Sequence, residues 1–304
     1  MKKAIGEITL ARATSPKSFR EALLNRKRRS ALSPDGKLFL IAADHPARGA
    51  LRVGDNPYAM ANRVELLERI IAALPHCDGI LASADILEDL AFLGLLDNKV
   101  LIGTTNRGGI VGAQWELDDP MTAYDAAHIE ELGLDGGKAL LRIARDDPSS
   151  ARTIEACARL VTELNDRKLM AMIEPLPYQL IKDSFGVTHA QLLKDEAQLI
   201  AATTVASGLG SSSGYTWLKL PAWSNIPLMA QATTLPILLL GGEVTTDFEE
   251  SLKLWSQALT TPVRPLQGLV IGRSLLYPKM ENGTGSISDI ENVMKKTAAI
   301  LRPC

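Results

Sequence analysis

The chain has 304 residues, 46% of them hydrophobic and 22% charged, and a formal net charge of −2, which are the bulk properties of a soluble globular protein. This charge gives no reason to expect nucleic acid or an anionic membrane as a partner, and no apolar run reaches the roughly 20 residues that a membrane span requires. Three scattered cysteines, Cys77, Cys157 and Cys304, are too few for a disulfide framework or a zinc site. We therefore expect a cytoplasmic protein.

Strand-like and helix-like runs alternate along almost the whole chain from Leu38 onward. Eight such pairs in one α/β chain of this size predict a (β/α)8 TIM barrel rather than an open doubly wound sheet. Residues 1–36 would then form an N-terminal helical extension over the bottom of the barrel, and residues 37–304 the catalytic barrel domain. The predicted strands are Leu38–Ala43, Gly79–Ala82, Val100–Thr104, Ala139–Ile143, Leu169–Ile173, Tyr215–Leu220, Ile237–Leu240 and Gly268–Ile271, and the predicted helices span 56–74, 85–95, 121–132, 150–167, 188–206, 227–233, 246–259 and 287–301.

Lys219 lies near the end of the sixth predicted strand, two residues before Pro221. Active sites of TIM barrels are built at the carboxyl ends of the strands, so this position favours a catalytic role. Burial disfavours a charged ammonium, and a lysine in such a place can attack a carbonyl group as a free amine. Other lysines near predicted strands, including Lys138, stand at strand beginnings, where we expect a solvated surface charge.

Two carboxylates, Asp44 and Glu174, follow the first and fifth predicted strands at the points where the chain turns. A carboxylate beside a lysine is the pairing that imine formation needs for its proton transfers. Either carboxylate alone could equally be a salt-bridged strand end or a helix cap. Together with Lys219 they predict covalent amine chemistry, and we expect Lys219 to be buried within hydrogen-bonding distance of Glu174.

Glycines follow the seventh and eighth predicted strands, as Gly241-Gly242 and as Gly272, and Arg273 comes directly after the last of them. A double glycine alone is the mark of a tight turn. Unobstructed backbone N–H groups at this place often bind phosphate in barrels, and a guanidinium adds a fork of donors. The combination therefore predicts a phosphate subsite.

Metal catalysis is the poorer interpretation of this face. Of the four histidines only His45 lies there, and the sequence has no His-x-His or His-x-x-x-His spacing. We expect no cofactor. The glycine-rich segment 208–214 leads from a helix into a strand, so we interpret it as a flexible connector on the opposite face rather than a phosphate cradle.

At these positions the sequence resembles the bacterial class I aldolases of the tagatose-bisphosphate and sulfofructose-phosphate aldolase group. Asp44-His45 and Arg48-Gly49 together are similar to that group's Asp-Gln-Arg-Gly segment, with Pro46-Ala47 inserted. The other similar segments are Glu174-Pro175, the Schiff-base strand Leu218–Pro221, and the Gly-x-x-x-Gly-Arg segment from Gly268 to Arg273. The resemblance implies an imine on Lys219, proton transfer by Glu174, and Asp44 and Arg48 in the same site. It also implies that Gly242, Gly272 and Arg273 hold a phosphate.

Two positions depart from this group's pattern. The second strand ends in Ser83, where the group tends to carry an acidic residue, although Asp85 is close by. The lysine that the group carries on strand four appears as Leu141, with Arg142 as the candidate to replace it in substrate binding. Both changes imply the same chemistry on a different substrate. The chain also resembles an uncharacterised barrel family of actinobacterial inositol-catabolism clusters, which implies 2-deoxy-5-keto-gluconate 6-phosphate.

The leading hypothesis is a class I aldolase that cleaves a phosphorylated keto-sugar or keto-acid and releases dihydroxyacetone phosphate. One alternative is a non-catalytic phosphosugar-binding barrel, in which Lys219 and Glu174 form a structural ion pair. Another is a phosphosugar isomerase or transferase on the same fold. We expect a small-molecule phosphorylated ligand, no nucleic-acid or membrane partner, and a homo-oligomer.

Overall fold

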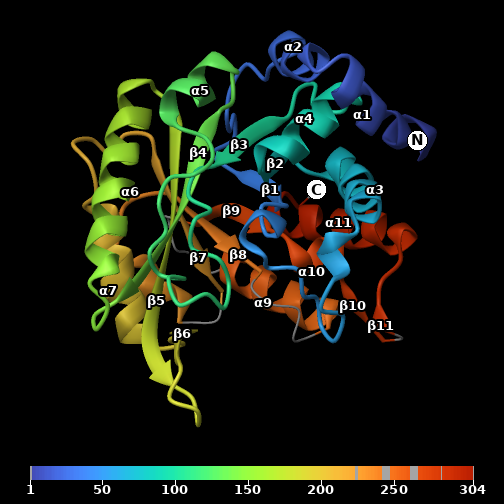
Figure 1. The fold of residues 1–304 in the computed structure, drawn as a ribbon. Helices are drawn as coiled ribbons and strands as arrows, with labels where there is room; N and C mark the ends of the chain where they lie inside the picture. The colour runs from blue at the N-terminus through green and yellow to red at the C-terminus, as the bar shows by residue number, and fades with distance from the viewer. Residues whose placement is uncertain (1, 223–224, 242–246, 261–265, 282, 304) are drawn as a thin grey trace.

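The fold is a closed parallel barrel, seen in a computed structural model that describes residues 2–222, 225–241, 247–260, 266–281 and 283–303 (Figure 1). Eight strands run side by side in a ring, and parallel pairing of the fourth with the fifth and of the last with the first closes it. The predicted (β/α)8 barrel is confirmed. The ring consists of β1 (Leu38–Ala42), β2 (Gly79–Ala82), β3 (Val100–Thr104), β4 (Gly136–Ala144), β5 (Met170–Lys182), β7 (Thr216–Pro221), β8 (Ile237–Leu240) and β9 (Leu266–Ile271).

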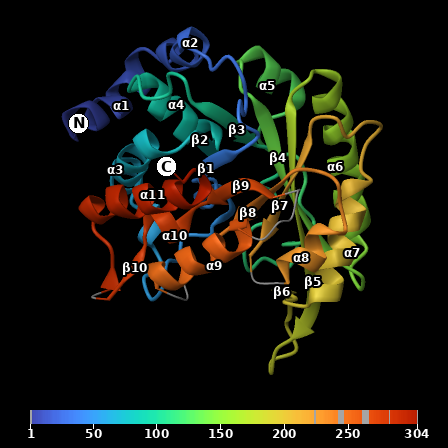
Figure 2. The same cartoon turned by 180° about the vertical axis from the view of Figure 1, so that it is seen from behind.

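Helices between the strands cover the outside of the barrel (Figures 1 and 2). The first of them begins later than predicted, because the side chain of Asn62 accepts a hydrogen bond from the backbone N–H of Glu65 and caps the helix there. The helices after β1 are α3 (Arg63–Ala73), α4 (Ala84–Phe92), α5 (Ala126–Glu131), α6 (Ser149–Asp166), α7 (Glu196–Ser207), α8 (Ile226–Ala230), α9 (Phe248–Thr260), α10 (Arg273–Leu276) and α11 (Ile287–Leu301), with short 3-10 turns at Pro46–Arg48, Ala59–Ala61 and Leu74–His76 and a small hairpin of β10 (Lys279–Met280) and β11 (Gly283–Thr284).

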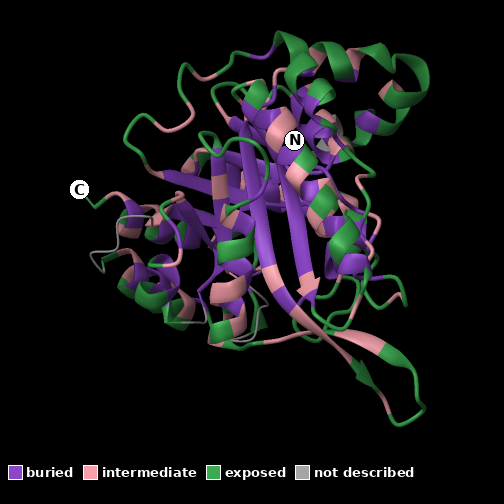
Figure 3. Ribbon diagram, turned by 90° about the vertical axis from the view of Figure 1, so that its left-hand side faces the viewer, coloured by how far each residue is buried: buried purple, intermediate pink, exposed green. Residues whose placement is uncertain are grey.

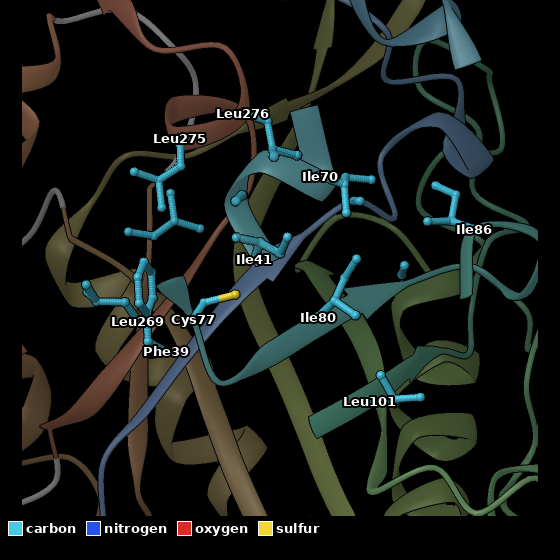
Figure 4. Packing of buried hydrophobic residues seen from close by; sticks show 14 of the residues in the cluster. Phe39, Ile41, Ile70, Cys77, Ile80, Ile86, Leu101, Leu269, Leu275 and Leu276 are labelled. Carbon is cyan, nitrogen blue, oxygen red and sulfur yellow. The ribbon is translucent and has the colours of Figure 1, made fainter. Parts of the chain in front are cut away.

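The alternation of side chains along each strand produces two hydrophobic layers. On β1, Phe39 and Ile41 point outward and pack with residues of the surrounding helices, including Ile70 and Leu275 (Figure 4). Leu40 points inward, where it belongs to a separate cluster that fills the barrel below the carboxyl ends of the strands. That inner cluster consists of Leu38, Leu40, Ala42, Leu81, Val100, Ile102, Met170, Met172, Leu238 and Val270.

The N-terminal extension packs against the outside of the barrel and against its amino-terminal end. Its helices α1 (Lys2–Thr14) and α2 (Lys17–Asn25) lie outside α4, where Phe19 stacks on Phe92 with ring centroids 4.7 Å apart. Below them the chain passes under the barrel, and the carbonyl of Lys27 accepts a hydrogen bond from the N–H of Asn98, just before β3. At this end of the barrel, Leu32 of the same segment packs against the inner hydrophobic cluster.

A two-stranded arm projects from the barrel between β5 and α7 (Figure 3). Strand β5 continues beyond the ring, and its residues from Tyr178 onward pair antiparallel with β6 (Thr188–Leu192). The helix predicted for 188–206 is thus wrong in its first part. A tight turn causes the difference, because Gly186 has a positive φ of 79° and Asp183 Oδ1 accepts hydrogen bonds from the N–H groups of Phe185 and Val187.

Two further expectations concern the surroundings of the barrel. The segment 208–214 connects α7 to the start of β7, at the end of the barrel opposite to the carboxyl ends of the strands, as the sequence predicts. Among the helices that the structure describes, none is both long and apolar enough to cross a membrane.

Candidate active site

A cavity of about 490 Å³ opens at the carboxyl ends of the barrel strands. Side chains from several strands line it, and β6 of the arm and helix α9 complete its walls. This is the face on which TIM-barrel active sites are built. The charged residues that line it are Asp44, Arg48, Arg107, Lys138, Glu174, Lys194, Lys219 and Arg273.

Lys219 and Glu174 meet inside this cavity, as predicted. Lys219 on β7 is 4% exposed, and its Nζ donates a hydrogen bond of 3.2 Å to Glu174 Oε2 on β5. The two strands are neighbours, with Ile173 opposite Leu218, so the side chains that follow on the inner face point at one another. The structure places an amine and a carboxylate in the contact that imine formation requires.

Lys138 belongs to the same group, and the expectation of a solvated surface charge is wrong. It is 2% exposed, and its Nζ lies 2.5 Å from Glu174 Oε2 and 3.5 Å from Asp44 Oδ2. Strand β4 begins at Gly136, earlier than predicted, so Lys138 lies within the strand and faces the barrel interior. Leu141 instead packs in the outer hydrophobic layer. Because side chains alternate along a strand, Lys138 shares the inward face of β4 with Leu140, two residues later.

Asp44 completes a chain of four buried charged side chains that we call the lysine cluster: Asp44, Lys138, Glu174 and Lys219. Its carboxylate also accepts a hydrogen bond of 3.3 Å from the Thr104 hydroxyl. Arg107, which the sequence analysis did not single out, places Nη2 at 2.9 Å from Asp44 Oδ2. No local pattern marks Arg107, because it lies in the long loop between β3 and α5.

Within the lysine cluster, the pKa values of the two carboxyl groups lie far below that of Lys138. Desolvation raises the pKa of Glu174, but Lys138 and Lys219 lower it more strongly, to about 2. Desolvation also raises the pKa of Asp44, and Arg107 and Lys138 hold it well below its usual range. Burial lowers the pKa of Lys138 to about 8, although the two carboxylates oppose this shift. Among these three groups, Lys138 has the pKa closest to neutral pH and is best matched to proton transfer.

His45 lies on the cavity wall beside the lysine cluster. Its Nδ1 is buried, forms no hydrogen bond within the described ranges and lies 3.8 Å from Asp44 Oδ1. Burial lowers the pKa of His45 to about 3, with a further contribution from Arg273, so the imidazole is neutral. In the part of the chain that the structure describes, no three His, Cys, Asp or Glu side chains are grouped to hold a metal ion.

Three of the four residues predicted to bind phosphate line the same cavity. They are Gly241 after β8, Gly272 after β9 and Arg273 at the start of α10. A Cβ atom on Gly272 would lie 2.5 Å from His45 Cε1, so only glycine fits beside this ring. Gly242 lies outside the described residues.

The two remaining predicted site residues, Arg48 and Arg142, belong to a second group that we call the arginine cluster: Arg48, Glu116, Asp119 and Arg142. Both guanidinium groups contact Asp119 Oδ2, Arg48 at 2.5 Å and Arg142 at 3.3 Å, and both donate to the carbonyl of Gly109. Arg142 also donates to Glu116. Arg48 lines the cavity, whereas Arg142 is absent from its lining and is held by the loop above β4. The structure therefore places Arg142 beside the cavity lining, in contact with Gly109, Glu116 and Asp119.

The sequence pattern of the Cgl0159-like family matches residues 36–290, most of the barrel. The chain belongs to the Cgl0159-like family. A crystal structure of Cgl0159 from Corynebacterium glutamicum is 40% identical, with 98% of this chain and 97% of that one aligned and a TM-score of 0.90. No curated protein matches this Cgl0159-like chain.

More distant structures share the barrel of this Cgl0159-like protein. An archaeal fructose 1,6-bisphosphate aldolase is 18% identical over 93% of this chain and 98% of that one, with a TM-score of 0.61. Another archaeal fructose-1,6-bisphosphate aldolase, with its catalytic Lys covalently bound to the carbinolamine intermediate of the substrate, is 16% identical over 92% and 99%, with a TM-score of 0.57. At these identities the likeness establishes the TIM-barrel fold alone, which is broader than the tagatose-bisphosphate group that the sequence resembles.

Proposed function

We propose that this protein is a class I aldolase that cleaves a phosphorylated keto-sugar or keto-acid through an imine on Lys219. The observation that carries the proposal is the lysine cluster, in which Glu174 Oε2 lies 3.2 Å from Lys219 Nζ and 2.5 Å from Lys138 Nζ. This arrangement gives one amine a carboxylate for proton transfer and a second amine within the same chain of contacts. The archaeal aldolase with a carbinolamine on its lysine supports the same class of reaction.

In the proposed reaction Lys219 is the nucleophile, and the other side chains of the lysine cluster accept and return protons. The Lys219 amine adds to the ketone carbon, and loss of water from the carbinolamine gives an iminium ion. A hydroxyl proton passes to the cluster while the carbon–carbon bond breaks, its electrons enter the iminium as an enamine, and an aldehyde leaves. Protonation of the enamine carbon and addition of water then release the ketone, which we propose to be dihydroxyacetone phosphate, and regenerate Lys219.

The phosphate of this substrate would bind at Gly241, Gly272 and Arg273. The three residues share the cavity wall after β8 and β9, on the same cavity as Lys219. A guanidinium beside unobstructed backbone is a suitable site for a phosphate dianion. The identity of the other end of the substrate, including the inositol-derived keto-acid implied by resemblance, remains a prediction.

Borohydride trapping tests the proposal. Dihydroxyacetone phosphate and sodium borohydride should attach a reduced three-carbon phosphate adduct to the peptide that contains Lys219, as detected by mass spectrometry. Lys219→Arg should abolish the adduct, because a guanidinium stays protonated and cannot form the imine. The matched variant Lys138→Arg should retain it on Lys219. An adduct on Lys138 would exchange the roles of the two lysines, and protein without any adduct would support a phosphosugar-binding barrel.

A further inference from the structure

Arg107 contacts both the carboxylate and the backbone carbonyl of Asp44. Its Nη2 lies 2.9 Å from Asp44 Oδ2, and its Nη1 donates a hydrogen bond of 3.0 Å to the backbone carbonyl of the same residue. Its Nε donates to the carbonyl of Asn106 at 2.7 Å, which fixes the guanidinium plane. Arg107 is 8% exposed and lines the cavity. A planar fork in this position restrains both the main chain and the carboxylate of Asp44.

The arginine cluster holds the loop that carries Arg107. Arg48 donates to the carbonyl of Asn106 at 2.8 Å, directly before Arg107 in the chain. Asn106 in turn pairs with Leu140 on β4, donating from Nδ2 to the carbonyl and accepting at Oδ1 from the N–H. Asp119 Oδ1 accepts from the N–H of Gly109, two residues after Arg107. The backbone on both sides of Arg107 is therefore fixed by buried polar contacts.

Several groups face the Asp44 carboxylate, and Arg107 makes the shortest contact. Thr104 on β3 donates at 3.3 Å, Lys138 on β4 lies at 3.5 Å and His45 lies at 3.8 Å. Lys219 on β7 adds a more distant positive charge. We propose that Arg107 is a positioning residue of the imine site, which fixes the Asp44 carboxylate against Lys138. This inference rests on the aldolase function proposed above.

Removal of Arg107 should change turnover and its pH dependence together. Arg107→Ala should lower kcat roughly 10²-fold, the lower end of the range for groups that act in proton transfer. The acid limb of kcat/KM should move to higher pH, because loss of this cation raises the pKa of Asp44. Added guanidinium chloride at non-denaturing concentration should restore part of the turnover. Arg107→Lys should recover little, since an ammonium cannot hold the carboxylate and the carbonyl together.

Matched variants separate positioning from general stability. Arg152→Ala removes a surface ion pair of 2.7 Å to Asp118 on the same loop and should leave turnover and pH profile unchanged. Combining Arg107→Ala with Asp44→Asn should lower kcat little beyond Asp44→Asn alone, because both changes disable the same carboxylate. The inference would be overturned if the acid limb of kcat/KM stayed at the same pH in Arg107→Ala, or if the kcat losses of Arg107→Ala and Asp44→Asn were additive. It would also be overturned if guanidinium chloride restored no turnover to Arg107→Ala.

A readout independent of turnover keeps this test apart from that of the aldolase function. The difference between infrared pH titrations of the unaltered protein and of Asp44→Asn isolates the signal of the Asp44 carboxyl. The same difference, measured with and without Asp44→Asn in the Arg107→Ala protein, should show the Asp44 carboxyl becoming protonated at higher pH. If trapping leaves no adduct on either lysine of the unaltered protein, the proposed function fails. If trapping succeeds and the Asp44 titration is the same with and without Arg107, only the positioning role fails.

Discussion

The lysine cluster and the arginine cluster are both buried groups of cations and carboxylates near the carboxyl ends of the barrel strands. They differ in the partners that their cations contact. In the lysine cluster, two amines share one oxygen of Glu174, and all four side chains line the cavity. In the arginine cluster, guanidinium groups bond backbone carbonyls as well as carboxylates, and only Arg48 reaches the cavity.

The difference shows how burial can serve either chemistry or stability. A buried lysine can lose its proton, and burial lowers the pKa of Lys138 to about 8. An arginine keeps its charge, and its planar fork binds several acceptors at fixed angles. We therefore expect changes in the lysine cluster to reduce turnover with the fold intact, and changes in the arginine cluster to reduce the free energy of unfolding.

Glu174→Gln should give the largest effect, lowering turnover by roughly 10²- to 10⁴-fold, as is typical when a general acid or base is removed. The amide has the shape of the carboxylate but cannot accept and return a proton near neutral pH. Steady-state cleavage rates and circular dichroism together check the prediction. A variant that unfolds while keeping the specific activity of its folded fraction would make Glu174 a structural residue.

Asp119→Asn should act on stability, because it leaves Arg48 and Arg142 without the carboxylate that they share. Breaking a buried pair by removing one partner typically costs about 3–5 kcal/mol. Urea denaturation measures the loss. Asp118→Asn alters the neighbouring residue, which pairs at the surface with Arg152, and serves as the control with no expected change in midpoint. Equal midpoints for both variants would show that the arginine cluster does not stabilise the fold.

Arg273→Ala should raise KM for a phosphorylated substrate by roughly 10- to 100-fold, the range expected for losing a hydrogen bond to a charged group. The KM of the dephosphorylated analogue should change far less. The contrast matters more than the absolute loss, since a structural defect would weaken both substrates alike. Similar KM increases for the two substrates would remove the phosphate subsite from the proposal.

The pH profile should show the smallest effect. Lys138 is protonated below its folded pKa of about 8, and above it the cluster loses the cation that bridges Asp44 and Glu174. We therefore expect kcat/KM to fall as pH rises through about 8. In Lys138→Arg the remaining activity should lack this limb, because a guanidinium keeps its proton. A limb at the same pH in both proteins would assign it to another group.

Much of this arrangement could be predicted from local sequence. The alternation of apolar runs predicts the barrel, and Lys219 and Glu174 follow from their places at strand ends. Gly136 and Gly137 have no side chain to mark the start of β4, so the sequence predicts a strand that begins too late and leaves Lys138 outside it. The register of a strand depends on its neighbours, and here pairing with β5 from Met170 onward fixes it.

The contacts of Arg107 and Arg142 join parts of the chain that are distant in sequence. Arg142 has the strand position of a substrate-binding residue, but the loop carrying Glu116 folds over it and takes its hydrogen bonds. Arg107 occupies no regular element, and only the folded loop brings it to Asp44. Spacing in the sequence reports neither contact, because long loops follow no period.

The hydrophobic filling of the lower barrel has a consequence for the order of events in the proposed reaction. Leu38, Leu40 and Met172 are among the side chains that fill the barrel beneath the lysine cluster. The cavity is therefore closed at the bottom and opens at the carboxyl ends of the strands. Under the proposed reaction, the ketone fragment stays tethered to Lys219 after the carbon–carbon bond breaks, and the aldehyde departs through the mouth by which the substrate entered. Product release is then sequential, with the aldehyde first and the ketone second.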